Sequence, residues 1–299
     1  MITSVQLNPE SHRRRSTQGQ HNKSHILHER GSQHHWRGEG ALSIKCFVGG
    51  RAFYDVGVGR YAVDDNSYLI LNEGQTYSID IDSLNAIESF CIFFEQGFAE
   101  DVWSSLNAST NKLLEGAPEK KSPVNFFERT YLHDQILSPA LFSLRAKLSR
   151  SSAEPGWLAE QLHDIMERLL TVHAQTRKQV DEIRALRPGS REELYRRLHR
   201  ARDYARACLD QPVNINEMAG VACLSTNHFL RTFKQAFQQT PHQYLTRLRI
   251  ERAQSLLTQT DHRVTDICFA VGFESIGSFS SLFRQRVGLA PEEYRRAKR

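Results

Sequence analysis

The sequence predicts an α+β chain of two domains, an N-terminal antiparallel β-barrel or jelly roll with added helices and a C-terminal all-α domain. Three observations lead to this prediction. Short alternating strands fill residues 40–94, a Pro-Gly linker lies near residue 188, and one helical pattern occurs twice between residues 213 and 295. A length of 299 residues suits two domains better than one. The predicted parts are a flexible polar tail (1–35), a barrel domain (36–180), a linker (181–190) and a helical domain (191–299).

The composition predicts a soluble protein of a reducing compartment. The five cysteines are scattered without C-x-x-C spacing, which argues against a disulfide framework or a structural zinc site. The N-terminus has charge but no apolar segment of a secretory signal, and no apolar run reaches membrane-spanning length. We therefore expect a cytoplasmic protein with no membrane partner.

The positive charge is concentrated in the C-terminal third. Residues 190–299 hold 18 Lys and Arg against 11 Asp and Glu, whereas the whole chain has a net charge of only +5. A basic segment can be merely a solvated surface, but it is also what binding to nucleic-acid phosphates requires.

The first 35 residues are polar and contain six of the 13 histidines. They could form a metal-binding tract or a basic arm near DNA, but the composition favours a disordered tail. The histidines are His12, His21, His25, His28, His34 and His35.

Six short segments between residues 40 and 94 alternate as strands, separated by Gly, Asn and Asp turns such as Gly49-Gly50 and Glu73-Gly74. Such a small barrel encloses a cavity suited to one small ligand. No histidine occurs between Trp36 and Tyr131, so a metalloenzyme of this shape is not expected, and we expect neither a metal nor a cofactor. Four strand tyrosines could line a pocket, although core packing is the commoner role of strand aromatics. They are Tyr54, Tyr61, Tyr68 and Tyr77.

Residues 97–150 are predicted to be mainly helical, and a clearer helix follows from Trp157. Its apolar residues have the spacing of a short heptad seam. This pattern fits equally well a dimerisation helix and a helix packed on its own barrel. Next, Ser190 and Glu193 have the spacing of a capping box at the start of the following helix. The seam residues are Leu158, Leu162, Ile165, Leu169 and Val172.

The duplicated pattern consists of a short helix, a turn, a longer amphipathic helix and a helix start at proline. Phe229 corresponds to Phe279, and Phe233 to Phe283. Two helices around a tight turn are typical of a helix-turn-helix motif, and two motifs imply two DNA-reading heads.

In the first copy, Phe229, Phe233 and Phe237 recur every four residues and are assigned to the core, with Ser225 as the helix cap. Arg231 can bond guanine and Asn227 adenine in the major groove, whereas Lys234 suits a phosphate. A solvated face is the usual explanation of such residues, but the repeat favours DNA contact, most strongly at Arg231. The predicted DNA-binding residues of this copy are Ser225, Thr226, Asn227, His228, Leu230, Arg231 and Lys234.

The second copy has a less informative outer face, from which we expect phosphate anchoring and shape recognition more than base discrimination. Its predicted DNA-binding residues are Ser275, Ile276, Gly277, Ser280, Ser281 and Arg284.

Three stretches resemble the AraC/XylS family of bacterial transcription regulators. They are RIERAQSLL (249–257), GF-x-S-x-x-x-F-S-x-x-F-R (272–284), and Gly288-Leu289-Ala290-Pro291 followed by Tyr294-Arg295. The resemblance covers about 110 residues, and the N-terminal half looks like a cupin-type sensor domain by pattern only. It implies a dimeric regulator whose partners are double-stranded operator DNA, a small-molecule effector and RNA polymerase. It further implies base contacts at Asn227, Leu230, Arg231, Ile276, Gly277, Ser280 and Ser281.

Three departures from that family pattern are visible. Gln238 stands where glycine commonly ends the recognition helix, so the helix end is expected to differ. Cys223 occupies the tight turn, where it serves better as a small turn residue than as a redox group. Leu230 suggests contact with a thymine methyl group.

The leading hypothesis is a ligand-responsive transcription regulator that is not an enzyme. One alternative is a cupin-type metalloenzyme fused to a DNA-binding module. Another is a regulator with a vestigial sensor that responds to a protein partner.

Overall fold

The computed structural model describes residues 23–57, 59–107, 123–150, 154–183, 188–209, 211 and 213–298. The chain forms two compact units, Met1–Arg191 and Glu192–Arg299, and the division lies one residue after the expected end of the linker. Most of the predicted tail, with His12 and His21, and residues 184–187 of the predicted linker lie outside the described residues.

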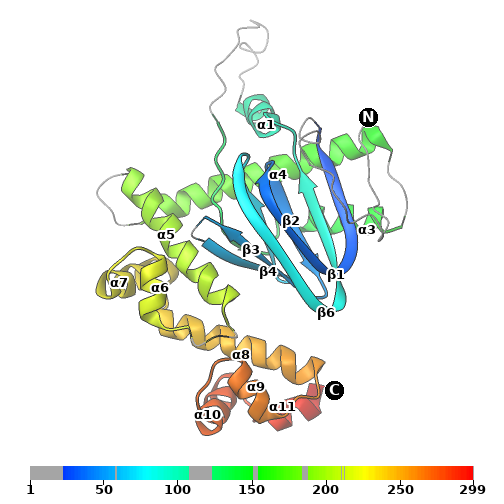
Figure 1. Ribbon diagram of the computed structural model, residues 1–299. Coiled ribbons are helices and arrows are strands. Elements are labelled where there is room, and N and C mark those ends of the chain that lie inside the picture. The colour runs from blue at the N-terminus through cyan, green and yellow to red at the C-terminus, as the bar shows by residue number, and fades with distance from the viewer. Residues whose placement is uncertain are drawn as a thin grey trace, which may run out of the picture. The chain divides into compact units, whose positions relative to one another are not determined.

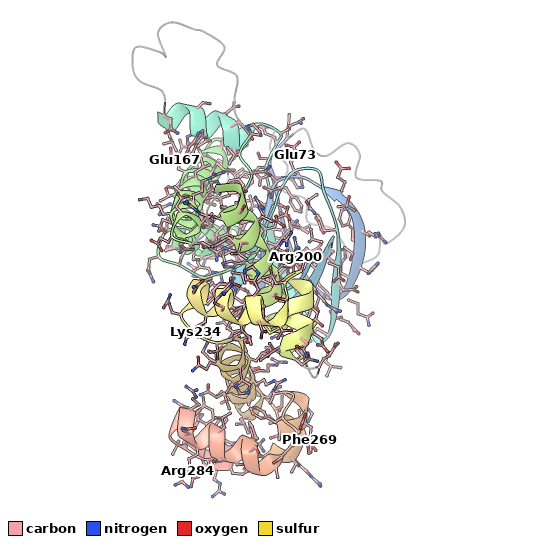
Figure 2. The ribbon with its side chains drawn as sticks, turned by 90° about the vertical axis from the view of Figure 1, so that its left-hand side faces the viewer. Glu73, Glu167, Arg200, Lys234, Phe269 and Arg284 are labelled. Carbon is pink, nitrogen blue, oxygen red and sulfur yellow. The ribbon has the colours of Figure 1, made fainter. Side chains whose placement is uncertain are left out.

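The N-terminal unit is built on one antiparallel sheet that curves into a nearly closed barrel (Figure 1). Its neighbouring strands follow the order β4-β3-β6-β2-β5-β7, and β1 pairs with β6. Turns at Gly49 and Gly74 have φ of 79° and 74°, which glycine adopts without strain, and Glu73 of the second turn is labelled in Figure 2. The strands are β1 (His25–Gly40), β2 (Ser43–Val48), β3 (Arg51–Val56), β4 (Gly59–Asp64), β5 (Ser67–Leu71), β6 (Gln75–Phe93) and β7 (Thr130–Leu132).

Two strands differ from the sequence prediction. Residues 25–35, expected in the tail, belong to β1, which pairs with β6 along its length apart from a register shift between Gly31 and Gln33. Residues 76–81 and 86–94, expected as separate strands, form one 19-residue strand, β6. The pairing with β1 holds β6 on both sides of the polar stretch 83–86, because Gly31 pairs with Ile87 and Gln33 with Asp82, while the register shift skips the residues between them. A short strand, β7, also interrupts the region 97–150 that was predicted to be helical.

The inner face of the barrel is filled with side chains. Phe47, Tyr54, Tyr61, Tyr77 and Ile87 belong to one buried apolar cluster. Three of the four strand tyrosines are therefore core residues of the barrel interior. The fourth, Tyr68, is buried on the opposite face, where its hydroxyl donates to Asp134 Oδ2 at 2.8 Å.

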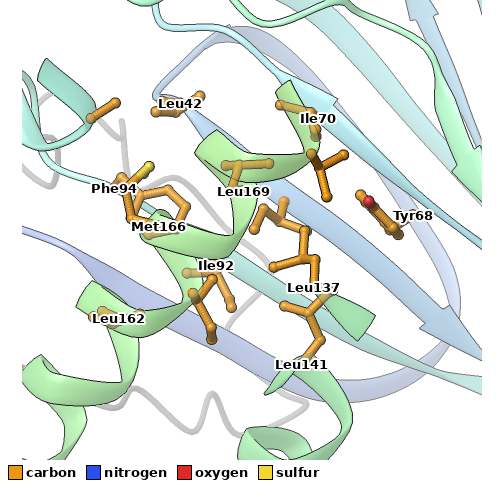
Figure 3. Packing of buried hydrophobic residues seen from close by; sticks show 14 of the residues in the cluster. Leu42, Tyr68, Ile70, Ile92, Phe94, Leu137, Leu141, Leu162, Met166 and Leu169 are labelled. Atoms are coloured by element: carbon orange, nitrogen blue, oxygen red, sulfur yellow. The ribbon is translucent and has the colours of Figure 1, made fainter. Parts of the chain in front are cut away.

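The opposite face of the sheet packs against α1 (Phe98–Asn107), α3 (Ser138–Leu148) and α4 (Pro155–Asp181). Figure 3 shows Leu162, Met166 and Leu169 of α4 among sheet residues that include Ile92. All five residues of the predicted seam are between 0% and 6% exposed in this cluster. The structure therefore favours the second explanation of the seam, a helix packed on its own domain, because these side chains already pack against the sheet of that domain.

The second unit consists of helices only. The helix α5 (Pro188–Ala207) includes the boundary between the two units. It begins two residues before Ser190, so Ser190 lies inside the helix and the expected capping box is not its start. Asp181, expected in the linker, still belongs to α4. The remaining helices are α6 (Ile215–Val221), α7 (Thr226–Phe237), α8 (Pro241–Gln259), α9 (Val264–Ala270), α10 (Ile276–Val287) and α11 (Pro291–Lys298).

No helix in the described part of the chain is long and apolar enough to cross a membrane. Across the same residues, no three His, Cys, Asp or Glu side chains are grouped so that they could hold a metal ion. The five cysteines are free thiols, and only Cys223 is exposed.

Candidate nucleic-acid interface

The first helix-turn-helix motif is α6, a tight turn and α7. A capping box starts α6, in which the Asn214 side chain accepts from the backbone N–H of Glu217 and the Glu217 side chain accepts from that of Asn214. In the turn, the backbone N–H groups of Cys223 and Leu224 donate to the carbonyl groups of Gly220 and Ala219 at 2.9 and 3.0 Å. These bonds reverse the chain within a few residues, so that α7 packs beside α6.

The helix α7 separates a buried face from an exposed one. Phe229 and Phe233 are fully buried, and Thr232 is buried beside them, so they fix the orientation of the helix. Phe237, expected in the core, is only half-buried and its ring lies 5.0 Å from that of His199 on α5. The opposite face carries the exposed side chains Asn227, Leu230, Arg231 and Lys234, and the half-buried His228.

The second motif repeats this geometry with α9 and α10. The N–H groups of Gly272 and Phe273 donate to the carbonyl groups of Phe269 and Cys268 at 2.9 and 3.1 Å, which matches the bonding of the first turn. Phe279 and Phe283 are fully buried and define the inner face of α10. The outer face exposes Ser275, Ile276, Gly277, Ser281 and Arg284, and Ser280 is half-buried.

The two turns use different residues at the same left-handed position. Cys223 has φ of 51° and Gly272 has φ of 83°. A side chain in this region costs about 1–2 kcal/mol, and only glycine avoids it. The predicted departure at Cys223 is thus a strained turn residue, and Gln238 at the end of α7, with φ of 53°, is another. Gln238 recovers part of this cost because its side-chain Nε2 donates to the Gln235 carbonyl at 2.8 Å.

We expect Gly272→Ala to lower the free energy of unfolding of the C-terminal unit by about 1–2 kcal/mol, because alanine would be strained at that φ. The added Cβ would also lie 3.1 Å from Arg249 Nε, so the guanidinium would have to move. The matched change Cys223→Gly should act oppositely and stabilise the unit by up to about 1 kcal/mol. Thermal unfolding followed by far-UV circular dichroism measures both. If both substitutions changed the free energy of unfolding by the same amount and in the same direction, the assignment of strain to these turns would be contradicted.

The helix α8 connects the two motifs. It starts with a capping box between Thr240 and Gln243 and with Pro241 in its first turn. On one side it contacts α7, and on the other it contacts α9 and α11 (Figure 1). Its residues Ile250, Ala253 and Leu257 are part of the buried cluster of the second motif. A single helix therefore belongs to the cores of both motifs.

The basic side chains of this unit differ in whether they form an ion pair with an acidic residue of the same helix. Arg196 and Arg197 on α5 are held by Glu192 and Glu193 one turn earlier, at 3.0 and 2.6 Å. Lys234 and Arg284, in the last turns of α7 and α10, are exposed. Figure 2 draws these two side chains on the same side of the unit, with Phe269 of α9 on the other side. Two exposed cations on one side suit contacts to a phosphate backbone.

The predicted polar site residues are not all free to bind a base. Ser225 occupies the N-cap position of α7, but its side chain accepts no capping hydrogen bond, contrary to expectation. The Thr226 hydroxyl donates to Asn216 Oδ1 at 3.0 Å. Ser275 Oγ accepts from the N–H of Ser278 at 3.2 Å and so serves as the cap of α10. These contacts give Thr226 and Ser275 structural roles.

Sequence reasoning missed Arg249 of α8 as a functional candidate. It was noted only as the first letter of the RIERAQSLL stretch, whereas its side chain lies against the turn of the second motif. Its position on the helix shared by both motifs could have indicated a role for Arg249. Its contacts could not be predicted, because they involve segments that are far away in the sequence.

Comparison with known proteins matches the C-terminal unit. Residues 218–297 match the family model described as "Helix-turn-helix domain". The chain is 37% identical over 87 residues to the melibiose operon regulatory protein of Escherichia coli K12, which covers 29% of each chain. It is 39% identical over 88 residues to the HTH-type transcriptional activator RhaS of an Enterobacter species, covering 29% of this chain and 32% of that one.

A solved structure is also similar to part of the chain. It is the DNA-binding domain of the global transcriptional factor AdpA in complex with a target DNA, at 29% identity and a TM-score of 0.33, covering 33% of this chain and 90% of that one. The matched segment spans about 30% of the length of the two regulators. The family match, over residues 218–297, covers α8, the second motif and most of the first.

Proposed function

We propose that this chain, whose C-terminal unit is a DNA-binding domain of the AraC/XylS family, is a regulator of transcription that binds double-stranded promoter DNA with sequence specificity. The observation that carries the proposal is the pair of motifs joined by α8. Each presents a helix whose aromatic face is buried and whose opposite face is exposed. Two such helices suit insertion into successive major grooves, about 34 Å apart along the duplex.

The first recognition helix, α7, has the better chemistry for reading bases. Arg231 can donate two hydrogen bonds to guanine, and Asn227 can both donate to and accept from adenine. Leu230, exposed between them, suits the methyl group of thymine. The second helix, α10, offers Gly277 and Ser281 at the same face, and Arg284 suits a phosphate. We infer that α7 supplies most of the discrimination and α10 most of the anchoring.

Selection of binding sites from random duplex DNA by the full chain tests this function. The expected result is a motif of two boxes whose centres lie about one helical turn apart. Binding that depends only on salt concentration and not on sequence would contradict a specific regulator, although it would still be DNA binding.

We expect Arg231→Ala to cost about 1–3 kcal/mol of binding to the selected site and to relax the preference at one base pair. The reason is the loss of a bidentate bond to a base edge. Lys234→Ala is the matched control, one helical turn further on the same exposed face, and should weaken selected and random DNA alike. Titration of labelled duplexes at fixed salt measures both variants. Equal losses on both DNAs for Arg231→Ala would instead make Arg231 a phosphate contact.

The N-terminal unit is proposed to sense a small molecule. The proposal is supported by a cavity of about 230 Å³ between β2 and α3, whose lining includes Cys46, Phe90, His133, Phe142 and Arg145. The aromatic filling of the barrel interior makes this cavity a better candidate than the barrel itself. A bound effector raises the stability of the folded unit, so thermal-shift screening would detect it. A library without any stabilising compound would favour response to a protein partner.

Further proposals come from the family resemblance and from the composition of the chain. They are a homodimer, contact with RNA polymerase, a cytoplasmic location and the absence of enzymatic activity. With the seam buried, a dimer would have to use another surface than the apolar face of α4.

A further inference from the structure

Arg249 reaches from the middle of α8 to the first motif. Its Nη2 donates to the carbonyl oxygen of Val213 at 3.3 Å, and Val213 immediately precedes Asn214, the N-cap of α6. The side chain is half-buried there. The position of its guanidinium is thus tied to the start of the first helix-turn-helix motif.

The same guanidinium lies against the turn of the second motif. Its Nε and Nη2 are so near Gly272 that a Cβ on this residue would be 3.1 Å from each. Its Cζ lies 5.8 Å from the ring centroid of Phe273. Phe273 in turn packs with Phe279, the buried anchor of α10, at 5.2 Å between ring centroids. One side chain therefore touches the backbone that starts α6 and the turn that positions α10.

The electrostatic surroundings fit a positioning role. Burial lowers the pKa of the Arg249 guanidinium, and the charge of Glu274, beside the same turn, acts in the opposite direction. A planar guanidinium can bond a carbonyl with its edge while its face covers a peptide or a ring, which the ammonium group of lysine cannot do. Without the Arg249 guanidinium, each motif would still be attached to α8 by its own apolar contacts. Of the described side chains of α8, none would then contact both the start of α6 and the turn before α10 in the way that Arg249 does.

We propose that Arg249 is a positioning residue that fixes the separation of the two recognition helices, and thereby the spacing of the DNA boxes that the chain accepts. The inference rests on the proposed function, since it needs two boxes to be read. It assigns to α8 a selectivity that none of the predicted base-contacting residues provides, because the property concerns spacing and not the sequence of either box.

The test uses the full chain and duplexes in which the two selected boxes are kept and their separation is varied by one base pair at a time. The wild type is expected to prefer one separation, near one helical turn. The preference is the ratio of the affinity for that separation to the affinity for a separation two base pairs longer. For Arg249→Gln this ratio should fall at least about threefold. The preference of Arg249→Lys, which keeps the charge, should lie between those of the wild type and of Arg249→Gln. Where Arg249→Gln does not fold, as judged by circular dichroism, the lysine variant carries the test.

Arg247→Gln is the matched control. Arg247 is exposed on the same helix and pairs with Glu251 of that helix at 2.8 Å. Its loss should leave the spacing preference unchanged, even if binding weakens at every separation. A spacing profile of a folded Arg249 variant that is identical to that of the wild type would overturn the proposal. So would an equal loss at all separations, which would mark Arg249 as a phosphate contact. A wild type that selects no boxes at all would instead overturn the proposed function.

Discussion

A chain with Leu162 replaced by aspartate is expected to lose its folded N-terminal unit, at a cost of about 4 kcal/mol or more in the free energy of unfolding. Leu162 is 1% exposed and lies in one apolar cluster with Ile92 of the sheet and Phe94, the residue after β6 (Figure 3). A carboxylate at this position would be buried without a partner, and the space of the leucine would be poorly filled.

Tryptophan fluorescence is the suitable measurement for Leu162→Asp. The three tryptophans, Trp36, Trp103 and Trp157, all lie in the N-terminal unit, so their emission reports on it alone. Ala159→Asp is the control, since Ala159 is exposed near the start of the same helix, where a negative charge is favourable. A folded Leu162→Asp chain with half the mass of the wild type in sedimentation would restore the dimer seam.

The helix α4 shows what sequence periodicity can and cannot predict. Spacing identified the buried face of the helix correctly, but it could not identify the partner that buries it. The buried stripe also includes Met166 and Leu170, which a heptad seam leaves out. With these two residues the stripe is wider than the narrow seam of a coiled coil and matches a helix packed on a core. The physical signal against dimerisation was therefore present in the sequence.

The strand β1 marks a different limit. Its sequence is mostly polar, and most of its residues are exposed or half-buried, so it resembles a tail in composition. These residues form a strand because their backbone pairs with β6. Backbone pairing leaves no pattern of apolar residues in the sequence from which the strand could be predicted. The strands of residues 43–71 were predictable because apolar side chains recur at every second position, as Tyr54 and Val56 of β3 and Tyr68 and Ile70 of β5 do, and each such row enters one apolar cluster.

The recognition helices were predictable because a duplicated pattern constrains both copies. Phe229 and Phe279 occupy equivalent buried positions, and this fixes which residues of α7 and α10 are exposed. The contacts of Arg249 were not predictable in this way. They join Val213, α8 and Gly272, and no local periodicity relates three such distant segments.

The second large effect is expected at Lys45, whose replacement by methionine should stabilise the N-terminal unit by about 3 kcal/mol at pH 7. Lys45 lies on β2 opposite Cys91 of β6 and is 2% exposed. Its ammonium donates to the Tyr77 hydroxyl at 3.3 Å and lies 3.7 Å from the ring centroid of Phe93. In the described part of the chain, its nearest polar partner is thus a phenol and not a carboxylate.

Burial lowers the pKa of Lys45 to about 8, against an ordinary value of 10.5, while the nearby Cys91 thiol acts in the opposite direction. Between these two pH values Lys45 binds more protons in the unfolded chain than in the folded one, so its contribution to the free energy of unfolding rises with pH. Below about pH 8 both states are protonated and the full cost of the buried charge is present. Burial also raises the pKa values of Cys91, Tyr54 and Tyr77.

Urea unfolding followed by tryptophan fluorescence at pH 7 and at pH 9.5 separates the two contributions. Lys45→Met should be more stable than the wild type at pH 7, and the difference should shrink at pH 9.5, because only the wild type gains stability as the lysine loses its proton. Lys147→Met is the control, since Lys147 is exposed on α3 and its replacement should change neither value appreciably. If the wild type were equally stable at both pH values, or if Lys45→Met were less stable at pH 7, the ammonium of Lys45 would be stabilised by its surroundings. The charged Lys45 would then contribute favourably to the free energy of unfolding of the N-terminal unit.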